Sequence, residues 1–213
     1  MQLVVLGRDG VINALPQAGF VREPEEWQAL PGSLRAIARL NHARRHVAVI
    51  THQPAVGAGR MTLDALLRIH IRMQRELDAE GGWVDALLYC PHPEDVSCEC
   101  RKPRPGLLQE LGQRLGADLR QAVVIGDSLA DIEAARAVGA RPVLVRSGRG
   151  EHILAALRGD SRLEGVIVAA DLAEAVAWLL DEPSGGSSGS AAAGSPAGGS
   201  RATGRKKRAE RDA

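Results

Sequence analysis

Short apolar segments alternate with longer amphipathic segments over the first 180 residues of the chain. The short segments have the length and the Val, Ile and Leu content of buried strands. The alternation of strands and helices, with such short connections, predicts a three-layer, Rossmann-like α/β fold with a parallel central sheet covered on both faces. We expect strands at 2–6, 47–51, 86–89, 123–126, 142–145 and 166–168, and helices near 32–44, 62–79, 106–116, 129–138, 150–158 and 172–181.

The composition changes at Pro183, beyond which Gly, Ser, Ala and Pro dominate and a basic run, Arg205–Arg208, follows. Such a segment cannot bury enough apolar surface to offset the entropy cost of ordering it. We therefore expect one domain at 1–182 and a disordered tail at 183–213. The formal net charge of +1 divides into about +4 on the tail and −3 on the domain. An acidic domain argues against nucleic-acid binding, except for weak contacts of RNA or an acidic partner with the tail.

The cysteines and the apolar segments bear on the location of the protein. All three cysteines lie within eleven residues, which suits metal ligation in a reducing compartment better than a disulfide framework. No segment approaches the roughly 20 consecutive apolar residues that a membrane span requires, and the first residues lack the pattern of a secretory signal. We expect a cytoplasmic monomer that does not associate with membranes.

Residues suited to phosphate chemistry follow four of the predicted strands. In an open parallel sheet ligands bind beyond the carboxyl ends of the strands, so these side chains are expected to converge. A lysine can neutralise a phosphoryl group, and carboxylates such as Asp127 and Asp131 suit Mg²⁺. Each residue alone has a structural explanation, as a helix cap, a strand-end hydroxyl or a surface charge, but the ordered set predicts one phosphoryl pocket. The four residues are Asp9, Thr51, Lys102 and Asp127.

Three cysteines and one histidine, Cys90, His92, Cys98 and Cys100, form a compact set of soft ligands. A Cys₃His set is typical of closed, tetrahedral zinc sites. The alternative is a group of free thiols beside a helix. Because the segment continues directly into Lys102, we expect a structural zinc ion that determines where the lysine points.

Taken together, these motifs resemble the haloacid dehalogenase-like (HAD) superfamily, and more closely the D-glycero-D-manno-heptose 1,7-bisphosphate phosphatases and the related histidinol-phosphatase domain. The resemblance spans roughly residues 1–180 and implies a HAD fold without a separate cap domain. It also implies a Mg²⁺-dependent phosphomonoesterase that acts on a small phosphorylated sugar through an aspartyl-phosphate. The motifs are Arg8-Asp9-Gly10-Val11-Ile12-Asn13, Thr51-x-Gln53, Cys100-Arg101-Lys102-Pro103-x-Pro105-Gly106 and Gly126-Asp127-Ser128.

The resemblance also implies a role for each matching residue. Asp9 would protonate the leaving oxygen, later deprotonate water, and offer its backbone carbonyl to Mg²⁺, which Asp127 would hold through its carboxylate. The cysteines and His92 would hold zinc. The residues implied to face the substrate are Thr51, His52, Gln53, Arg101 and Lys102.

Position 7 departs from this family pattern. Gly7 stands where the family has the aspartate that attacks phosphorus and also binds Mg²⁺, so we expect a weakened magnesium site and a reduced or absent phosphatase activity. A structural explanation of Gly7 is relief of backbone strain at a strand-to-loop corner. In the second motif, His52, Pro54 and Ala58 replace the family's Asn, Ser and Arg.

Three functions therefore compete for this sequence. The first is a sugar-phosphate phosphatase with reduced or lost activity, and the second is a noncatalytic phosphosugar-binding or partner-regulating protein. The third is a zinc-stabilised scaffold whose basic tail recruits RNA or an acidic partner. Retention of all four strand-end residues favours the first two, because a pure scaffold needs none of them. The loops 14–28 and 90–101 are expected to shape substrate specificity.

Overall fold

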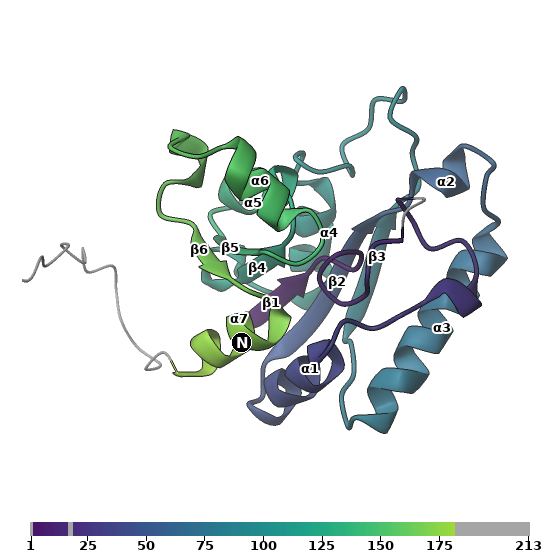
Figure 1. The fold of residues 1–213 in the computed structure, drawn as a ribbon, viewed down its shortest axis with the longest axis horizontal. Coiled ribbons are helices and arrows are strands. Elements are labelled where there is room, and N and C mark those ends of the chain that lie inside the picture. The colour runs from purple at the N-terminus through teal and green to yellow at the C-terminus, as the bar shows by residue number, and fades with distance from the viewer. Residues whose placement is uncertain (1, 17–18, 182–213) are drawn as a thin grey trace, which may run out of the picture. The chain divides into compact units, whose positions relative to one another are not determined.

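The computed structural model describes residues 2–16 and 19–181. The tail predicted at 183–213 lies outside the described residues. Within them, six strands form one all-parallel sheet in the order β3-β2-β1-β4-β5-β6 (Figure 1). Every predicted strand is confirmed, with bounds that shift by no more than one residue. The strands are β1 (Leu3–Leu6), β2 (His46–His52), β3 (Ala86–Cys90), β4 (Val123–Gly126), β5 (Arg141–Val145) and β6 (Ile167–Ala169).

The six predicted helices are also confirmed, each within two residues of its expected ends. They are α1 (Ser33–His42), α3 (Leu63–Ala79), α4 (Gly106–Leu115), α5 (Leu129–Ala137), α6 (Gly150–Ala156) and α7 (Leu172–Asp181). The apolar pattern did not predict four shorter turns, because three or four residues are too few to show a helical period. These are the α-helical turn α2 (Pro54–Gly57) and the 3₁₀ turns η1 (Pro24–Glu26), η2 (Leu119–Gln121) and η3 (Ser161–Leu163).

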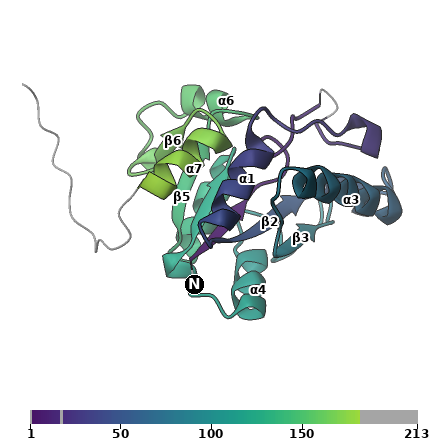
Figure 2. The same ribbon diagram turned by 90° about the horizontal axis from the view of Figure 1, so that it is seen from below.

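Alternate residues of the central strand β1 pack against different helical layers. Val4 and Leu6 belong to a core with α1, α3 and α7, whereas Leu3 and Val5 belong to a second core with α4 and α5. Figure 2 shows the helices on the two sides of the sheet. Because both faces are covered, all four β1 residues are buried, which explains why the strand is continuously apolar rather than alternating.

The described residues form one compact unit around this sheet, with no separate cap domain inserted into it. This confirms the expected three-layer HAD-like arrangement. None of the helices in the described part of the chain is long and apolar enough to cross a membrane.

Candidate active site

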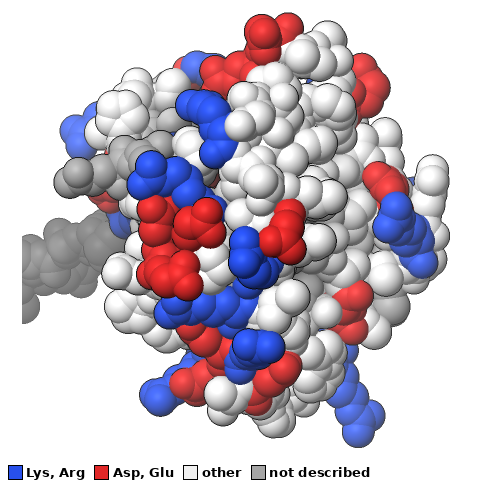
Figure 3. Space-filling view, turned by 90° about the vertical axis from the view of Figure 1, so that its right-hand side faces the viewer, with Lys and Arg blue, Asp and Glu red and all other residues white. Residues whose placement is uncertain are grey.

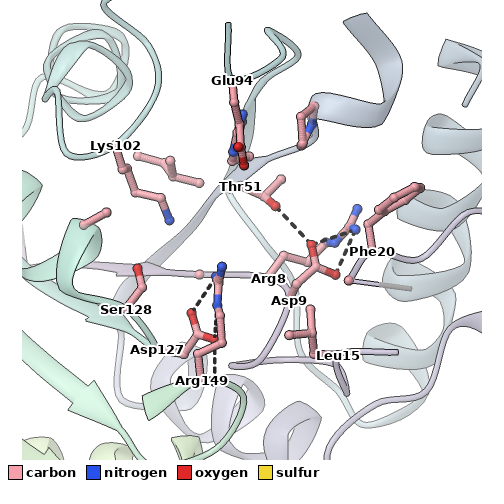
Figure 4. A pocket seen from close by; sticks show the side chains of 16 residues that line it. Arg8, Asp9, Leu15, Phe20, Thr51, Glu94, Lys102, Asp127, Ser128 and Arg149 are labelled. Carbon is pink, nitrogen blue, oxygen red and sulfur yellow. Dashed lines mark hydrogen bonds and ion pairs between the residues drawn. The ribbon is translucent and has the colours of Figure 1, made fainter. Parts of the chain in front are cut away.

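A cavity of about 210 Å³ opens at the carboxyl ends of the central strands. Its walls include five of the sequence-predicted residues, Asp9, Thr51, His52, Lys102 and Asp127. The first of these follows β1, Thr51 and His52 end β2, and Asp127 follows β4, so the parallel sheet brings them to one edge as expected. Figure 4 shows the side chains of Asp9, Thr51, Lys102 and Asp127 around a common space.

Both loops that were expected to shape specificity reach this cavity. Leu15, Gly19 and Phe20 line it from the loop after β1, and Glu94 lines it from the loop after β3. Pro54, at the first position of the short turn α2, lines it as well. The walls of the cavity are therefore partly apolar, whereas its base at the strand ends is charged.

The Asp9 carboxylate is held by a dense set of hydrogen-bond donors. Arg8 Nη2 lies 3.0 Å from each carboxylate oxygen, Asn13 Nδ2 donates to Oδ1 at 3.0 Å, and Gln53 Nε2 donates to Oδ2 at 2.8 Å. Burial alone would raise the pKa of Asp9, but the Arg8 charge and these hydrogen bonds outweigh it and lower the pKa. Asp9 is thus an oriented carboxylate at the base of the cavity.

Gln53 lies behind this carboxylate and does not reach the cavity wall. It is fully buried, and its amide donates to Asp9 and to Thr51 Oγ1, the latter at 2.8 Å. The sequence pattern placed Gln53 among the substrate-facing residues. The structure places it where it positions two other side chains instead. Gln53 directly precedes α2, and its backbone N–H donates to the Cys90 carbonyl oxygen at the end of β3 at 2.8 Å.

His52 and Arg101 both bind the backbone of the segment after β3, His52 from the end of β2 and Arg101 from within that segment. His52 Nε2 donates to the carbonyl oxygen of His92 at 2.9 Å, and Arg101 Nη1 donates to the carbonyl oxygen of Pro93 at 2.6 Å. His52 still lines the cavity, and its burial lowers its pKa. Arg101 does not line the cavity. Of the five residues expected to face the substrate, three line the cavity, whereas Gln53 and Arg101 do not.

Lys102 forms an ion pair with Asp131 across the sheet edge. Oδ2 of Asp131 accepts hydrogen bonds from the backbone and the hydroxyl of Ser128, which close a capping box at the start of α5. Burial opposes ionisation, but the Lys102 charge lowers the pKa of Asp131 overall. The second carboxylate of this motif therefore pairs with the lysine and caps the helix.

Arg149, which was not predicted, binds the carboxylate of Asp127. Its backbone N–H and its Nε donate to Oδ2 at 3.0 and 3.2 Å, and its Nη2 donates to Oδ1 at 3.1 Å. Arg149 follows β5, which pairs with β4, and it lines the cavity. The sequence signal that could have identified Arg149 is the segment Ser147-Gly148-Arg149-Gly150, which follows the fifth predicted strand. The strand order that brings it to Asp127 could not be obtained from the sequence.

The residues in this cavity do not fit a magnesium ion held as the family resemblance implies. Gly7 has no side chain, and both oxygens of Asp127 are engaged by Arg149. The Asp9 carboxylate is occupied by its own donors, and Glu94 lies across the cavity from Asp127 (Figure 4). Mg²⁺ is usually held by one or two carboxylates together with waters and substrate phosphate. Here the position-7 carboxylate is missing and the Asp127 carboxylate is paired with Arg149.

The backbone at Gly7 does not require a glycine. Its φ lies outside the left-handed region, and its N–H donates to the carbonyl oxygen of Ile125 at 2.9 Å. A Cβ added at this position would meet Val11 Cγ2 at 3.0 Å and the Ile125 carbonyl oxygen at 3.8 Å. A small movement of the Val11 methyl group would admit a side chain. Strain relief therefore does not explain why the carboxylate is absent.

The four predicted zinc ligands form a compact cluster beside the cavity. Their ligand atoms all lie within 4.8 Å of one another. Cys90 Sγ is 3.7 Å from Cys98 Sγ and 3.2 Å from Cys100 Sγ, and His92 Nδ1 is 3.1 Å from Cys100 Sγ. Tetrahedral zinc with Zn–S bonds of about 2.3 Å places its ligand atoms about 3.5–3.8 Å apart. The donor set therefore fits a zinc ion, and the atoms lie close enough together for the cluster to hold a metal.

His70 is a further residue that the sequence did not connect to this region. Its Nε2 lies 2.9 Å from Nη1 of Arg8, a fully buried guanidinium. Arginine only donates, so Nε2 must be the acceptor and the ring must be neutral. Burial and the Arg8 charge lower the pKa of His70 to about 4. The line His70–Arg8–Asp9 thus connects α3 to the base of the cavity.

Comparisons with known proteins identify relatives of this chain. A family model described as "HAD-hyrolase-like" matches residues 99–175. The chain is 42% identical over 178 residues to the D-glycero-beta-D-manno-heptose-1,7-bisphosphate 7-phosphatase of Pseudomonas aeruginosa, a match that covers 84% of this chain and 97% of that protein. It is 43% identical over 182 residues to the same enzyme of Bordetella bronchiseptica, with 85% and 99% covered.

A solved structure supports the same relationship. The crystal structure of D,D-heptose 1,7-bisphosphate phosphatase from B. bronchiseptica, complexed with magnesium and phosphate, is similar with a TM-score of 0.81 at 43% identity. The match covers 86% of this chain and all of that chain. The identity, its coverage and the shared fold show that this chain belongs to the heptose-1,7-bisphosphate 7-phosphatase family of HAD-like hydrolases.

Proposed function

We propose that this chain binds a small phosphorylated sugar of the heptose bisphosphate type and hydrolyses it slowly or not at all. The observation that carries the proposal is Gly7 on the wall of a cavity that keeps all four predicted phosphate-site residues. A retained cavity supports binding, whereas the missing carboxylate supports a loss of the covalent step. The protein is proposed to act in the cytoplasm.

Several groups in the cavity suit a phosphate ester. The Lys102 ammonium and the Thr51 hydroxyl both line the cavity, and either can donate to phosphoryl oxygens. The Asp131 ion pair holds the lysine in place, and Gln53 holds the threonine. Preorganised donors of this kind recognise an anion at a small entropic cost, because their side chains are already ordered.

The chemistry is limited by what remains to attack phosphorus. Asp9 can exchange a proton with the leaving oxygen or with water. Its five donor contacts, however, direct its oxygens to Arg8, Asn13, Gln53 and Thr51. A general acid or base without a nucleophile leaves hydrolysis to direct attack by water. Removing a covalent nucleophile commonly lowers kcat by roughly 10⁴ to 10⁶-fold.

The test compares phosphate release from D-glycero-D-manno-heptose 1,7-bisphosphate by the wild type, Gly7→Asp and Gly7→Asn, with and without added Mg²⁺. We expect Gly7→Asp to exceed the wild type by about 10³-fold or more, since Gly7 tolerates a Cβ. Gly7→Asn has nearly the same shape but no attacking carboxylate, so it should remain at the wild-type rate.

Two results would contradict the proposal. One is a wild-type rate of phosphate release that equals the rate of Gly7→Asp and that does not change when Asp9 is replaced by Asn. The other is an absence of heptose bisphosphate binding under any condition.

A noncatalytic phosphosugar-binding or partner-regulating role is the second candidate function. The specific observation in its favour is the Arg149–Asp127 ion pair, which occupies the carboxylate that a phosphatase of this family would use for its metal. Tight binding of heptose bisphosphate by calorimetry, without release of phosphate by the wild type, would favour this role over slow catalysis.

Zinc is proposed as a structural component. The Cys₃His cluster matches a closed zinc site. The carbonyl oxygen of its His92 accepts from His52, and that of the adjacent Pro93 accepts from Arg101. A zinc ion there would order the segment that continues into Lys102.

A further inference from the structure

The segment that carries Arg149 is anchored firmly against the base of the cavity. The hydroxyl of Ser147 donates to the carbonyl oxygen of Gly10 at 2.8 Å, and the Arg149 N–H donates to Asp127 at 3.0 Å. Gly10 and Gly148 both have positive φ, and a Cβ on either would lie within 2.4 Å of Asp127 Oδ2. The two loops and the carboxylate therefore pack so closely that only glycine fits at these two positions.

This anchoring fixes the guanidinium at one edge of the cavity. Asp127 is almost fully buried, with a side chain that is 3% exposed, whereas the Arg149 side chain is 57% exposed. Nε and Nη2 bind the carboxylate, and Nη1 forms no hydrogen bond with any described residue. One side of the guanidinium is thus held by the protein while the other side is available to a ligand.

The charges around the Asp127 carboxylate favour an arginine over a divalent cation. Arg149 already neutralises Asp127, and the hydrogen bonds to that carboxylate raise the pKa of Arg149 further. An incoming Mg²⁺ would have to separate this pair, and Gly7 provides no second carboxylate to hold the ion. Guanidinium groups bind phosphate oxygens through parallel, charge-assisted hydrogen bonds.

We propose that Arg149 takes the electrostatic place of the divalent cation in this chain, so that the cavity binds a phosphate ester without Mg²⁺. The inference depends on the proposed function for the identity of the ligand. Arg149, Lys102 and Thr51 line the same cavity, and Figure 4 shows their side chains reaching into it from the strands and loops around it. A phosphoryl group placed among them would meet two cations and one hydroxyl.

Isothermal titration calorimetry tests this inference, with inorganic phosphate and heptose 1,7-bisphosphate as the two probes. The protein is exchanged into Mg²⁺-free buffer without a chelator, so that the cysteine cluster is left intact, and is compared with the same protein in millimolar Mg²⁺. We expect the wild-type Kd to change less than about twofold, whereas Arg149→Ala should weaken Kd about tenfold or more in both buffers. Arg149→Lys, which keeps the charge but loses the fork, should lie between them.

The matched control is Arg146→Ala. Arg146 is three residues away and pairs with Glu151 at 2.8 Å, away from the cavity wall, so its loss should leave Kd unchanged. Thermal unfolding of every variant checks that the fold is retained. Conversely, the double variant Gly7→Asp/Arg149→Ala should acquire Mg²⁺-dependent phosphate binding.

Phosphate binding that requires Mg²⁺ in the wild type would overturn the inference, as would unchanged binding in Arg149→Ala. Either result leaves the proposed function intact, because the ligand still binds. Rapid wild-type hydrolysis would contradict the proposed function alone, whereas an absence of binding in both buffers would contradict both.

Discussion

Arg8 is an arginine whose side chain has no exposed surface, so its charge depends entirely on neighbouring side chains. Asp9 supplies the opposite charge, and His70 supplies a neutral acceptor. A buried charge that loses one partner is costly, because the lost hydrogen bond is not replaced by water. The neutral state of His70 is therefore part of what keeps the base of the cavity ordered.

This arrangement predicts a pH-dependent stability. The pKa of His70 is about 4 in the folded protein, against 6.5 as its ordinary value, so between these pH values the unfolded chain binds more protons. The contribution of His70 to the free energy of unfolding is complete above about pH 6.5 and decreases as the pH falls towards 4. Between pH 7 and pH 4.5 this loss amounts to roughly 2 kcal/mol.

Urea unfolding of the wild type and His70→Gln at both pH values measures this loss. The glutamine carbonyl can accept from Arg8 but does not titrate, so the variant should lose roughly 2 kcal/mol less than the wild type. Equal losses in the two proteins would show that His70 is not the titrating group. Other titrating groups are present in both proteins and cancel in the comparison.

At the residue scale, the sequence was most informative where a side chain directly follows an apolar strand. Asp9, Thr51 and Asp127 were placed at one cavity because the carboxyl ends of parallel strands share an edge. Arg149 and His70 escaped prediction because their contacts depend on which strands are neighbours and on how α3 faces the sheet. Neither property is encoded in the local pattern of the sequence.

At the element scale, the apolar pattern predicted the helices and strands closely, because each element buries one continuous surface. It missed α2 and the 3₁₀ turns, which lack a long apolar face. The segment after β3 has no regular secondary structure and almost no apolar residues, so the cysteine cluster is the feature that can order it. That segment accepts a hydrogen bond from His52, which lines the cavity, so the order of the segment is connected to the cavity.

A zinc-deficient variant should therefore alter both stability and binding. We expect Cys98→Ser to lower the zinc content measured by mass spectrometry from one ion per chain, and to lower Tm by several degrees. It should also weaken phosphate binding, because the segment leading to Lys102 loses its fixed position. Ser97→Ala is the matched control: Ser97 is adjacent and only accepts from Arg104 at 3.1 Å, so zinc content and Tm should stay unchanged. A wild type without zinc would contradict the structural role.

At the scale of the whole molecule, the charges are mixed rather than segregated on the face shown in Figure 3, where acidic and basic side chains lie next to one another. Several are paired on the surface, including Arg72 with Glu76 and Arg22 with Glu26. Surface pairs of this kind contribute little to stability, about 0–1 kcal/mol each. The basic run Arg205–Arg208 is thus the main concentration of one sign of charge in the sequence.

Deletion of residues 183–213 separates the contributions of the domain and the tail. Within the described part of the chain, the helices and strands that build both cores end at Asp181, and the tail sequence is too poor in apolar residues to add to them. The truncated chain should therefore have the same Tm within about 1 °C and the same Kd for heptose bisphosphate, by thermal unfolding and calorimetry. A drop of several degrees would mean that the tail packs against the domain. Weak binding of a model RNA, if the full chain shows any, should disappear on truncation, because the domain itself has a formal charge of −3.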